Sequence, residues 1–231
     1  MSIQIKNIIQ NQLYPLLNCI RDDYTIPHNC PKPSFSTLVW RTARYRAASF
    51  GFFLSEDERR IAEYKNRHEG QKVFILGNGP SLNRCDLKLL KNEITFGVNS
   101  IFLNHENMGF HPTYYVVEDV FVAEDRAKEI NAYKGPIKFF GNYLKYCISD
   151  SEDTRWLNVR FRYDDYPDFP YFSTNAARMV WVGGTVSYIC LQLAYYMGFS
   201  EIYLVGFDHS YTIPTDADMI GTEIKSKSDD P

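Results

Sequence analysis

The feature that most constrains the fold is an alternation of short apolar runs and helical patterns that begins at Gly70. Runs such as KVFILG and HPTYYVVED are each followed by a longer stretch with helical periodicity. Apolar runs without polar alternation are typical of strands that are buried on both faces. The pattern predicts an α/β, Rossmann-like fold, with a mainly parallel sheet and helices on both of its faces.

The expected elements of this region are assigned from their apolar runs and flanking turn residues. Strands are expected at 72–77, 94–100, 111–119, 136–141, 156–163 and 200–208, and helices at 83–92, 122–133 and 183–199. We therefore interpret residues 70–231 as a Rossmann-like nucleotide-binding domain. The end of this region, SKSDDP, lacks a closing helix or strand and suggests truncation.

Residues 1–69 are interpreted as a separate, mostly helical N-terminal segment. Helical stretches are expected at about 3–21 and 35–68, on either side of the proline-rich sequence IPHNCPKPS. Within the second stretch, Ser55 and Glu58 have the spacing of a capping box, which predicts a helix that continues to about His68. The sequence WRTARYR at 40–46 indicates contact with an acidic partner, peripheral contact with a membrane, or simply a solvated helix face.

Charge and cysteine content exclude several classes of protein. The formal net charge is −3, with a sequence pI near 6.0, so we do not expect nucleic acid as a partner. The 5 cysteines are scattered and form no C-x-x-C pair, which favours reduced thiols over a disulfide framework or a zinc site. Because neither a signal peptide nor an apolar run long enough to span a bilayer is evident, the expected location is the cytoplasm.

The loop GNGPS follows the first expected strand and has the composition of a phosphate site. Gly77 and Gly79 permit close approach of the backbone, and Pro80 suits the first position of a helix. Asn78 and Ser81 add side-chain donors beside a helix N-terminus, which favours anions. The loop lacks the third small residue of a dinucleotide fingerprint and the Gly-Lys-Ser/Thr of a P-loop, so neither of those classes is favoured.

Further polar residues are expected at the same edge of the sheet. Asn99 ends the second strand, and Gly183, Gly184 and Thr185 begin the last helix. Other polar residues end the third and last strands: Glu118, Asp119, Asp208, His209 and Tyr211. Since ligands of parallel sheets bind at the carboxyl ends of the strands, these residues predict one shared pocket.

The chain resembles the MptE-like 6-hydroxymethylpterin diphosphokinase family in the order of its motifs. These motifs are LGNGPSL, the strand that ends at Asn99, GGT and the final LVGFDHSY. The chain is also similar to the bacterial CMP-dependent sialyltransferases and to the motility-associated glycosyltransferases. The resemblance covers about residues 70–215. It implies that Asn78 and the amides from Gly79 to Ser81 hold a nucleotide phosphate.

The same resemblance implies that Asn99 contacts the nucleotide and that residues 183–185 close over it, with Tyr211 as a phosphate ligand offset by one position. Two departures affect the chemistry. The sialyltransferases carry Asn where this chain has Glu118 and Asp119, and their catalytic His lies beyond the end of this sequence. Glu118 or Asp119 is then the expected base, with His209 as a weaker candidate.

Three functions are consistent with these residues. The first is transfer of a CMP-activated acidic sugar to a hydroxyl acceptor in surface glycan synthesis, with no obligatory cofactor. The second is an ATP-dependent 6-hydroxymethylpterin diphosphokinase, whose Mg²⁺ would be held by Glu118, Asp119 and Asp208 on neighbouring strand ends. The third is a non-catalytic nucleotide-binding domain.

Overall fold

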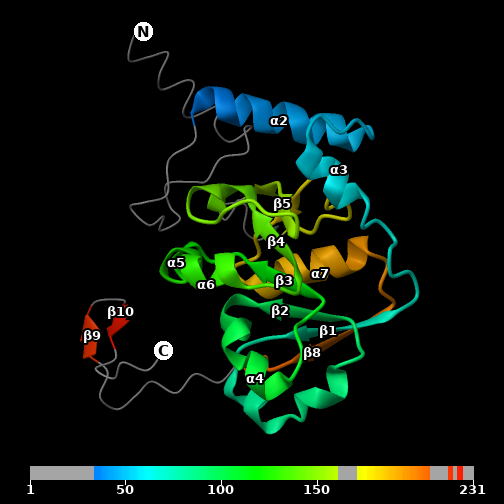
Figure 1. Cartoon of the computed structure of the whole chain (residues 1–231). Coiled ribbons are helices and arrows are strands. Elements are labelled where there is room, and N and C mark those ends of the chain that lie inside the picture. The colour runs from blue at the N-terminus through cyan, green and yellow to red at the C-terminus, as the bar shows by residue number, and fades with distance from the viewer. Residues whose placement is uncertain (1–33, 161–170, 209–217, 221–222, 226–231) are drawn as a thin grey trace.

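The computed structural model describes residues 34–160, 171–208, 218–220 and 223–225. Its centre is a sheet of six parallel strands in the order β5-β4-β3-β2-β1-β8 (Figure 1). The strands are β1 (Lys72–Leu76), β2 (Thr95–Val98), β3 (Tyr114–Val117), β4 (Ile137–Gly141), β5 (Thr154–Leu157) and β8 (Glu201–Val205). The α/β, Rossmann-like fold expected from the sequence is confirmed.

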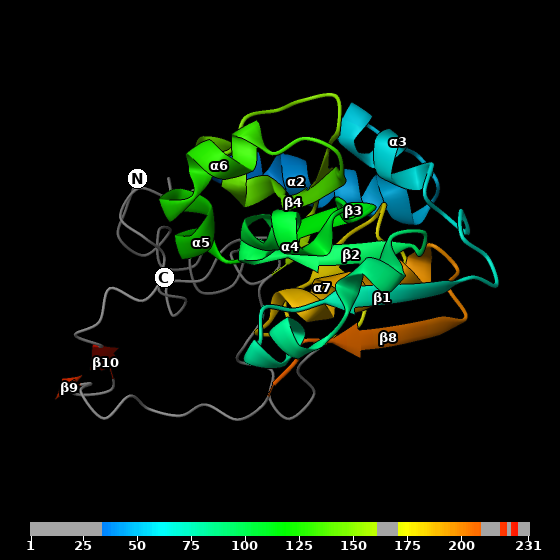
Figure 2. The ribbon, with the colours of Figure 1, turned by 60° about the horizontal axis from the view of Figure 1, so that its bottom comes forward.

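Helices cover both faces of the sheet. From β1 to β5 the chain moves in one direction, and its right-handed connections place α4 (His105–Met108), α5 (Val120–Asp125) and α6 (Ala127–Ala132) on one face. The chain then returns through α7 (Val186–Tyr196) to reach β8 on the other side of β1. Figures 1 and 2 show α7 on the face opposite α5 and α6.

The core explains why the strands appear as unbroken apolar runs. All four residues of β2 and all four of β3 are buried, and their apolar side chains join residues of β1, β4 and α7 in one apolar cluster. Tyr115, Phe96 and Phe139 are among the largest fully buried side chains. The aromatic residues, which make up 16% of the sequence, therefore supply core as well as surface positions.

Several expected elements are shorter or more divided than the sequence pattern indicated. The expected helix at 83–92 is two 3₁₀ helices, η2 (Pro80–Arg84) and η3 (Leu87–Leu90), because Asp86 caps a new turn by accepting the amide of Lys88. Similarly, 3₁₀ helices follow β2 and β4, namely η4 (Asn99–Asn104) and η5 (Asn142–Tyr146). The expected strand at 156–163 begins earlier and is split at Asn158 into β5 and β6 (Val159–Arg160).

Two small sheets complete the described elements. β6 pairs in parallel with β7 (Val180–Trp181), which leads directly into α7. β9 (Asp218–Ile220) and β10 (Glu223–Lys225) form an antiparallel pair. Neither pair extends the six-stranded sheet.

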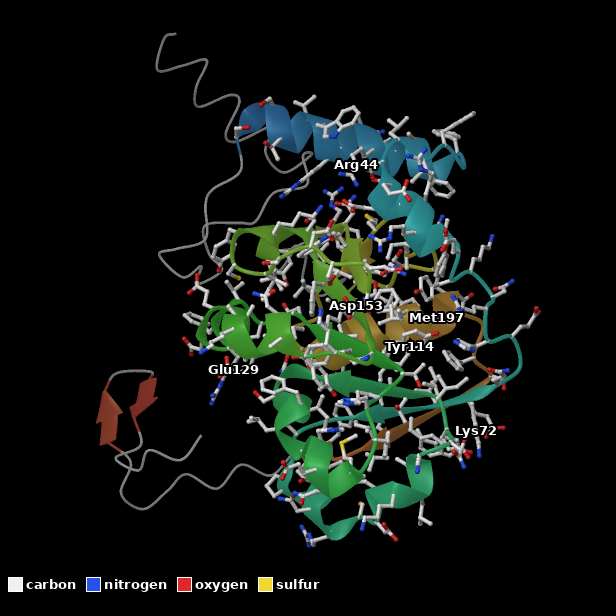
Figure 3. The ribbon with its side chains drawn as sticks, viewed as in Figure 1. Arg44, Lys72, Tyr114, Glu129, Asp153 and Met197 are labelled. Atoms are coloured by element: carbon white, nitrogen blue, oxygen red, sulfur yellow. The ribbon has the colours of Figure 1, made fainter. Side chains whose placement is uncertain are left out.

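The expected helix at 35–68 is two helices, α2 (Phe35–Ser49) and α3 (Glu56–Ala62). The predicted capping box is confirmed, since the Ser55 hydroxyl accepts the Glu58 amide while the Glu58 carboxylate accepts the Ser55 amide. Arg44 lies between the helices (Figure 3), and its Nε is 2.5 Å from Glu58 Oε1. The other expected helix, at 3–21, lies outside the described residues.

The helix α3 shares its core with the sheet. It packs against β5, and Ile61 and Tyr64 belong to the same apolar cluster as the strands. Tyr64 contacts Phe139 edge-on, with 5.2 Å between the ring centroids. The division at residues 69 and 70 stays a prediction, but the residues just before it contribute to the packing of the sheet.

Candidate functional site

The sheet order places a change of direction at β1. The connection that leaves β1 leads to β2 on one side, whereas the strand on its other side, β8, is reached only after the return through α7. Open α/β sheets bind ligands in the crevice beyond the carboxyl ends of the strands at such a point. The loop after β1 and the residues after β8 are therefore the first place to look for a site.

The glycines of the GNGPS loop allow this loop to lie directly against the end of β8. The amide of Gly77 donates to Val205 O at 2.8 Å, and that of Gly79 donates to Gly206 O at 2.9 Å. A Cβ atom added to Gly77 would lie 2.4 Å from Gly206 O, and one added to Gly79 would lie 2.7 Å from the same oxygen. Their first physical role is thus close packing of two strand ends.

The backbone amide at the start of η2 already donates a hydrogen bond to a carboxylate of the protein. Ser81 N donates to Asp208 Oδ2 at 2.6 Å, and a Cβ at Gly79 would lie 2.6 Å from the same oxygen. The structure thereby brings Gly79, Ser81 and Asp208 together, as expected. An anionic ligand that used the Ser81 amide would have to displace this carboxylate, because two negative groups repel at that separation.

Asn78 and Asn99 lie at the ends of neighbouring strands. Asn78 Nδ2 donates to Val98 O at 3.0 Å, which joins the loop after β1 to the end of β2. Asn99 adopts φ +48, in the left-handed region that residues with a Cβ rarely occupy. Its Oδ1 is buried and has no hydrogen-bond partner within the described part of the chain. An unpaired buried acceptor just beyond the end of a parallel strand is typical of a ligand site.

Tyrosine hydroxyls fix the turns at the ends of two strands. Tyr115 on β3 donates to Asn99 O at 2.5 Å, and Tyr143 in η5 donates to Glu118 O. Burial raises the pKa of Tyr115 well above its usual value, so its hydroxyl keeps the proton that it donates. Each tyrosine comes from the neighbouring strand or from the turn after it. The geometry of Asn99 and Glu118 thus depends on packing that a linear motif does not reveal.

Glu118 and Asp119 follow β3 in different environments. The side chain of Glu118 is buried, with 5% exposure. Asp119 is the N-cap of α5, and its Oδ1 accepts the amides of Phe121 at 2.8 Å and Val122 at 3.4 Å. One oxygen of Asp119 therefore has a structural role that the sequence analysis did not assign.

The expectation that Glu118, Asp119 and Asp208 lie on neighbouring strand ends is wrong. The strands β2 and β1 separate β3 from β8, so the two acidic positions are about 14 Å apart across the sheet at ordinary strand spacing. Within the described ranges, no group of three His, Cys, Asp or Glu side chains is placed to hold one metal ion. A magnesium ion needs only one or two carboxylates when phosphates supply further ligands, so Glu118 and Asp119 stay candidates as a pair.

The second glycine cluster begins α7, as expected. Thr185 is the N-cap residue, but its hydroxyl bonds Ser187 Oγ at 2.9 Å and caps no backbone amide. Gly184 has φ +78 with no atom within 4 Å of an added Cβ, whereas Gly183 packs against the ring of Tyr188. Because α7 leads back to the amino end of β8, its first residues lie toward the carboxyl edge of the sheet.

The sequence analysis did not identify two asparagines at the carboxyl edge of the sheet. Asn142 follows β4, and Asn158 follows β5, where its Nδ2 donates to Arg178 O at 3.2 Å. A simple signal would have found them, because each is the first side chain with polar atoms after a buried run. His209 and Tyr211, which were expected beside Asp208, lie outside the described residues.

These features define a Rossmann-like α/β protein with a polar edge formed by the ends of its strands. The family model described as 6-hydroxymethylpterin diphosphokinase MptE-like matches residues 53–214, and the chain belongs to this MptE-like family. The name of the family is that of a nucleotide-related transferase.

Two other results bear on relatives and location. No curated protein sequence matches the chain. In the ranges that the structure describes, no helix has both the length and the apolar character needed to cross a bilayer.

Proposed function

We propose that this chain is a nucleotide-dependent transferase whose nucleotide binds beyond the ends of β1, β2 and β8. The observation that carries the proposal is Asn99, with its left-handed backbone and its buried, unpaired Oδ1. An acceptor of this kind suits a donor group of a nucleotide, either a ribose hydroxyl or an exocyclic amine. Asn78, Ser81 and the residues from 183 to 185 would then surround the phosphate side of the ligand.

The transfer that we favour is that of a CMP-activated acidic sugar to a hydroxyl acceptor. The bond between the sugar and the CMP phosphate would break, and the acceptor oxygen would form the new bond to the sugar. Donors from the loop and from Tyr211 would stabilise the charge left on CMP. Glu118 or Asp119 would take the proton of the acceptor hydroxyl, and His209 is a further candidate for this role.

The separation of the acidic groups supports this order of preference. Asp208 lies on the nucleotide side, while Glu118 and Asp119 lie further along the edge, beyond β1 and β2. That spacing is suited to a donor at one end of the pocket and an acceptor with its base toward the other. It does not suit three carboxylates that share one ion.

A second candidate is the transfer of diphosphate from ATP to a hydroxymethyl-pterin. The description of the matching family favours it, and so does the adjacency of Glu118 and Asp119. Under this proposal one or both carboxylates would hold Mg²⁺, which would also bind the phosphates of ATP.

Calorimetric titration of the full chain with CMP, UDP, GDP and ATP, with and without Mg²⁺, separates these proposals. Magnesium-independent binding of CMP supports sugar transfer, and tight, magnesium-dependent binding of ATP without CMP binding supports the diphosphokinase. Asn99→Ala should weaken the binding of the preferred nucleotide, whereas Asn107→Ala, at an exposed site in α4, should leave it unchanged. Binding of no nucleotide would contradict both proposals.

A single-turnover assay addresses the remaining proposal, a domain that binds a nucleotide without catalysis. The full chain would be mixed in excess with CMP-activated sialic acid and a glycan acceptor, and in parallel with ATP and 6-hydroxymethylpterin. Product within one turnover supports a catalytic role. Tight nucleotide binding without product from either pair supports the non-catalytic proposal.

A further inference from the structure

Apolar side chains protrude from α2 and from the turn that follows it. Phe50 and Phe52 are 79% and 68% exposed, and Val39, Trp40 and Leu54 are about half exposed. We call these five residues the α2 patch. Single exposed apolar residues are ordinary on a protein surface, but five within 16 consecutive positions are not explained by chance exposure.

The packing of α2 leaves one face of the helix free of the protein core. Ala48 is buried, and Arg44 is directed to α3, where its guanidinium bonds Glu58 and Ser55. The exposed positions Val39, Ala43 and Phe50 are spaced by about one or two helical turns, so they form a stripe along the outer face. Val39 and Phe50 of the α2 patch therefore lie on the outer stripe, whereas Trp40, one helical turn before Arg44, lies at its side.

The charge of this segment is opposite to that of the whole chain. Residues 34–54 contain three arginines and no Asp or Glu, in a chain with a net charge of −3, and one of the three, Arg44, is paired with Asp57 and Glu58. Arg46, which is exposed, lies between Ala43 and Phe50 on the outer stripe. A surface that combines Trp, Phe and Leu with basic residues has the composition of an interfacial membrane-binding element.

We infer that the α2 patch binds the surface of an anionic lipid bilayer, a property that goes beyond the proposed transferase function. Phe50 and Phe52 protrude from a turn, a convex shape that can enter the headgroup region but fits poorly into a flat protein surface. Arg46 would contact lipid phosphates, and Trp40 would lie at the boundary between headgroups and acyl chains. The helix α2 is attached to α3, which packs against β5 at the edge of the sheet opposite to β8, so the surface is distinct from the site at the ends of β1 and β8.

Co-sedimentation of the full chain with vesicles tests this inference. The chain should sediment with vesicles of phosphatidylcholine and phosphatidylglycerol, but weakly with phosphatidylcholine alone, and high salt should reduce binding. The double substitution Phe50→Ser and Phe52→Ser should weaken binding about tenfold or more. Leu89→Ser is the matched control, because Leu89 in η3 is also 79% exposed.

Three results would overturn the inference. The first is that the full chain stays in the supernatant with anionic vesicles, and the second is that the Leu89 control loses as much binding as the double variant. The third is a dimer, seen by size-exclusion chromatography, that the double variant dissociates, which would assign the patch to a second copy. Thermal unfolding of each variant should match that of the parent chain, since exposed substitutions change stability little.

Discussion

The carboxylate of Asp208 accepts the backbone amide of Ser81 at 2.6 Å, although 127 positions separate the two residues. This bond joins the end of β8 to the start of η2, at the corner where the sequence analysis expected a phosphate. The amide is therefore suited to an anion, and the protein supplies one from its own chain. Under the proposed function, a nucleotide phosphate at this corner would have to compete with that carboxylate.

The substitution Asp208→Asn should strengthen nucleotide binding. The amide oxygen of the new side chain can still accept the Ser81 amide, but it no longer repels a phosphate, and we expect the affinity to rise about fivefold, or roughly 1 kcal/mol. Calorimetry with the preferred nucleotide measures the change. Asp86→Asn is the control, since it alters the net charge equally at an exposed cap of η3. Equal or weaker binding by the Asp208 variant would show that the carboxylate contacts the ligand favourably or not at all.

Replacing Gly79 with Ala should disrupt the same corner. The new Cβ would lie 2.6 Å from Asp208 Oδ2 and 2.7 Å from Gly206 O, and we expect a loss of about 1–3 kcal/mol in unfolding free energy together with weaker nucleotide binding. Urea unfolding and calorimetry give the two quantities. Gly109→Ala is the comparison, because Gly109 has φ +71 and open space around it. That control should lose about 1 kcal/mol of stability and keep its affinity.

Replacing Gln192 with Leu should destabilise the fold strongly. Gln192 is fully buried in α7, where its Oε1 accepts the amides of Ser173 and Trp181 and its Nε2 donates to Trp181 O and Tyr188 O. Leu would leave two buried amides unpaired, at about 1–3 kcal/mol each. Urea unfolding should show a loss of about 3 kcal/mol, while Asn107→Leu on the surface should change little. A loss below about 1 kcal/mol for Gln192→Leu would mean that the segment before α7 rearranges freely.

Stability should fall as the pH drops below 6.5. Burial lowers the pKa of His68 and of His111, and His105, stacked at 3.7 Å between ring centroids, lowers that of His111 further. Below the ordinary value of 6.5 the unfolded chain therefore binds more protons than the folded chain. The contribution of the two neutral histidines to the free energy of unfolding is complete above pH 6.5. It is lost as the pH falls toward their lowered pKa values. Unfolding free energies measured between about pH 8 and pH 5.5 test this, and His111→Gln should reduce the slope; an unchanged slope would contradict the assignment.

Much of the fold could be predicted from local patterns. The parallel sheet follows from apolar runs such as those of β2 and β3, which are buried along their whole length. The capping box of Ser55 and Glu58 was also predictable, because its partners lie three residues apart and need no tertiary context. Some expected helices are 3₁₀ helices instead, because side chains such as that of Asp86 accept nearby backbone amides and begin a new turn.

The strand order could not be read from the same patterns. Nothing local indicates that β8 pairs with β1, and this pairing is what separates Asp208 from Glu118 and Asp119. The roles of the glycines show the same limit. Gly77 and Gly79 were predicted to bring the backbone close to a ligand, whereas the structure shows that they bring it close to Gly206. A glycine motif indicates that the backbone is closely approached by another group, but only the tertiary structure shows which group that is.

The seating of β8 beside β1 has a consequence for how this protein is made on the ribosome. Among the six strands, the first to emerge pairs on one side with the last, so the nascent chain carries the GNGPS loop without its closing partner until β8 has been added. Such distant pairing is slow to form and exposes strand edges meanwhile. The corner between β1 and β8 is thus the last part of the sheet to mature, and chains released before Val205 is added would lack the strand that closes the proposed nucleotide site.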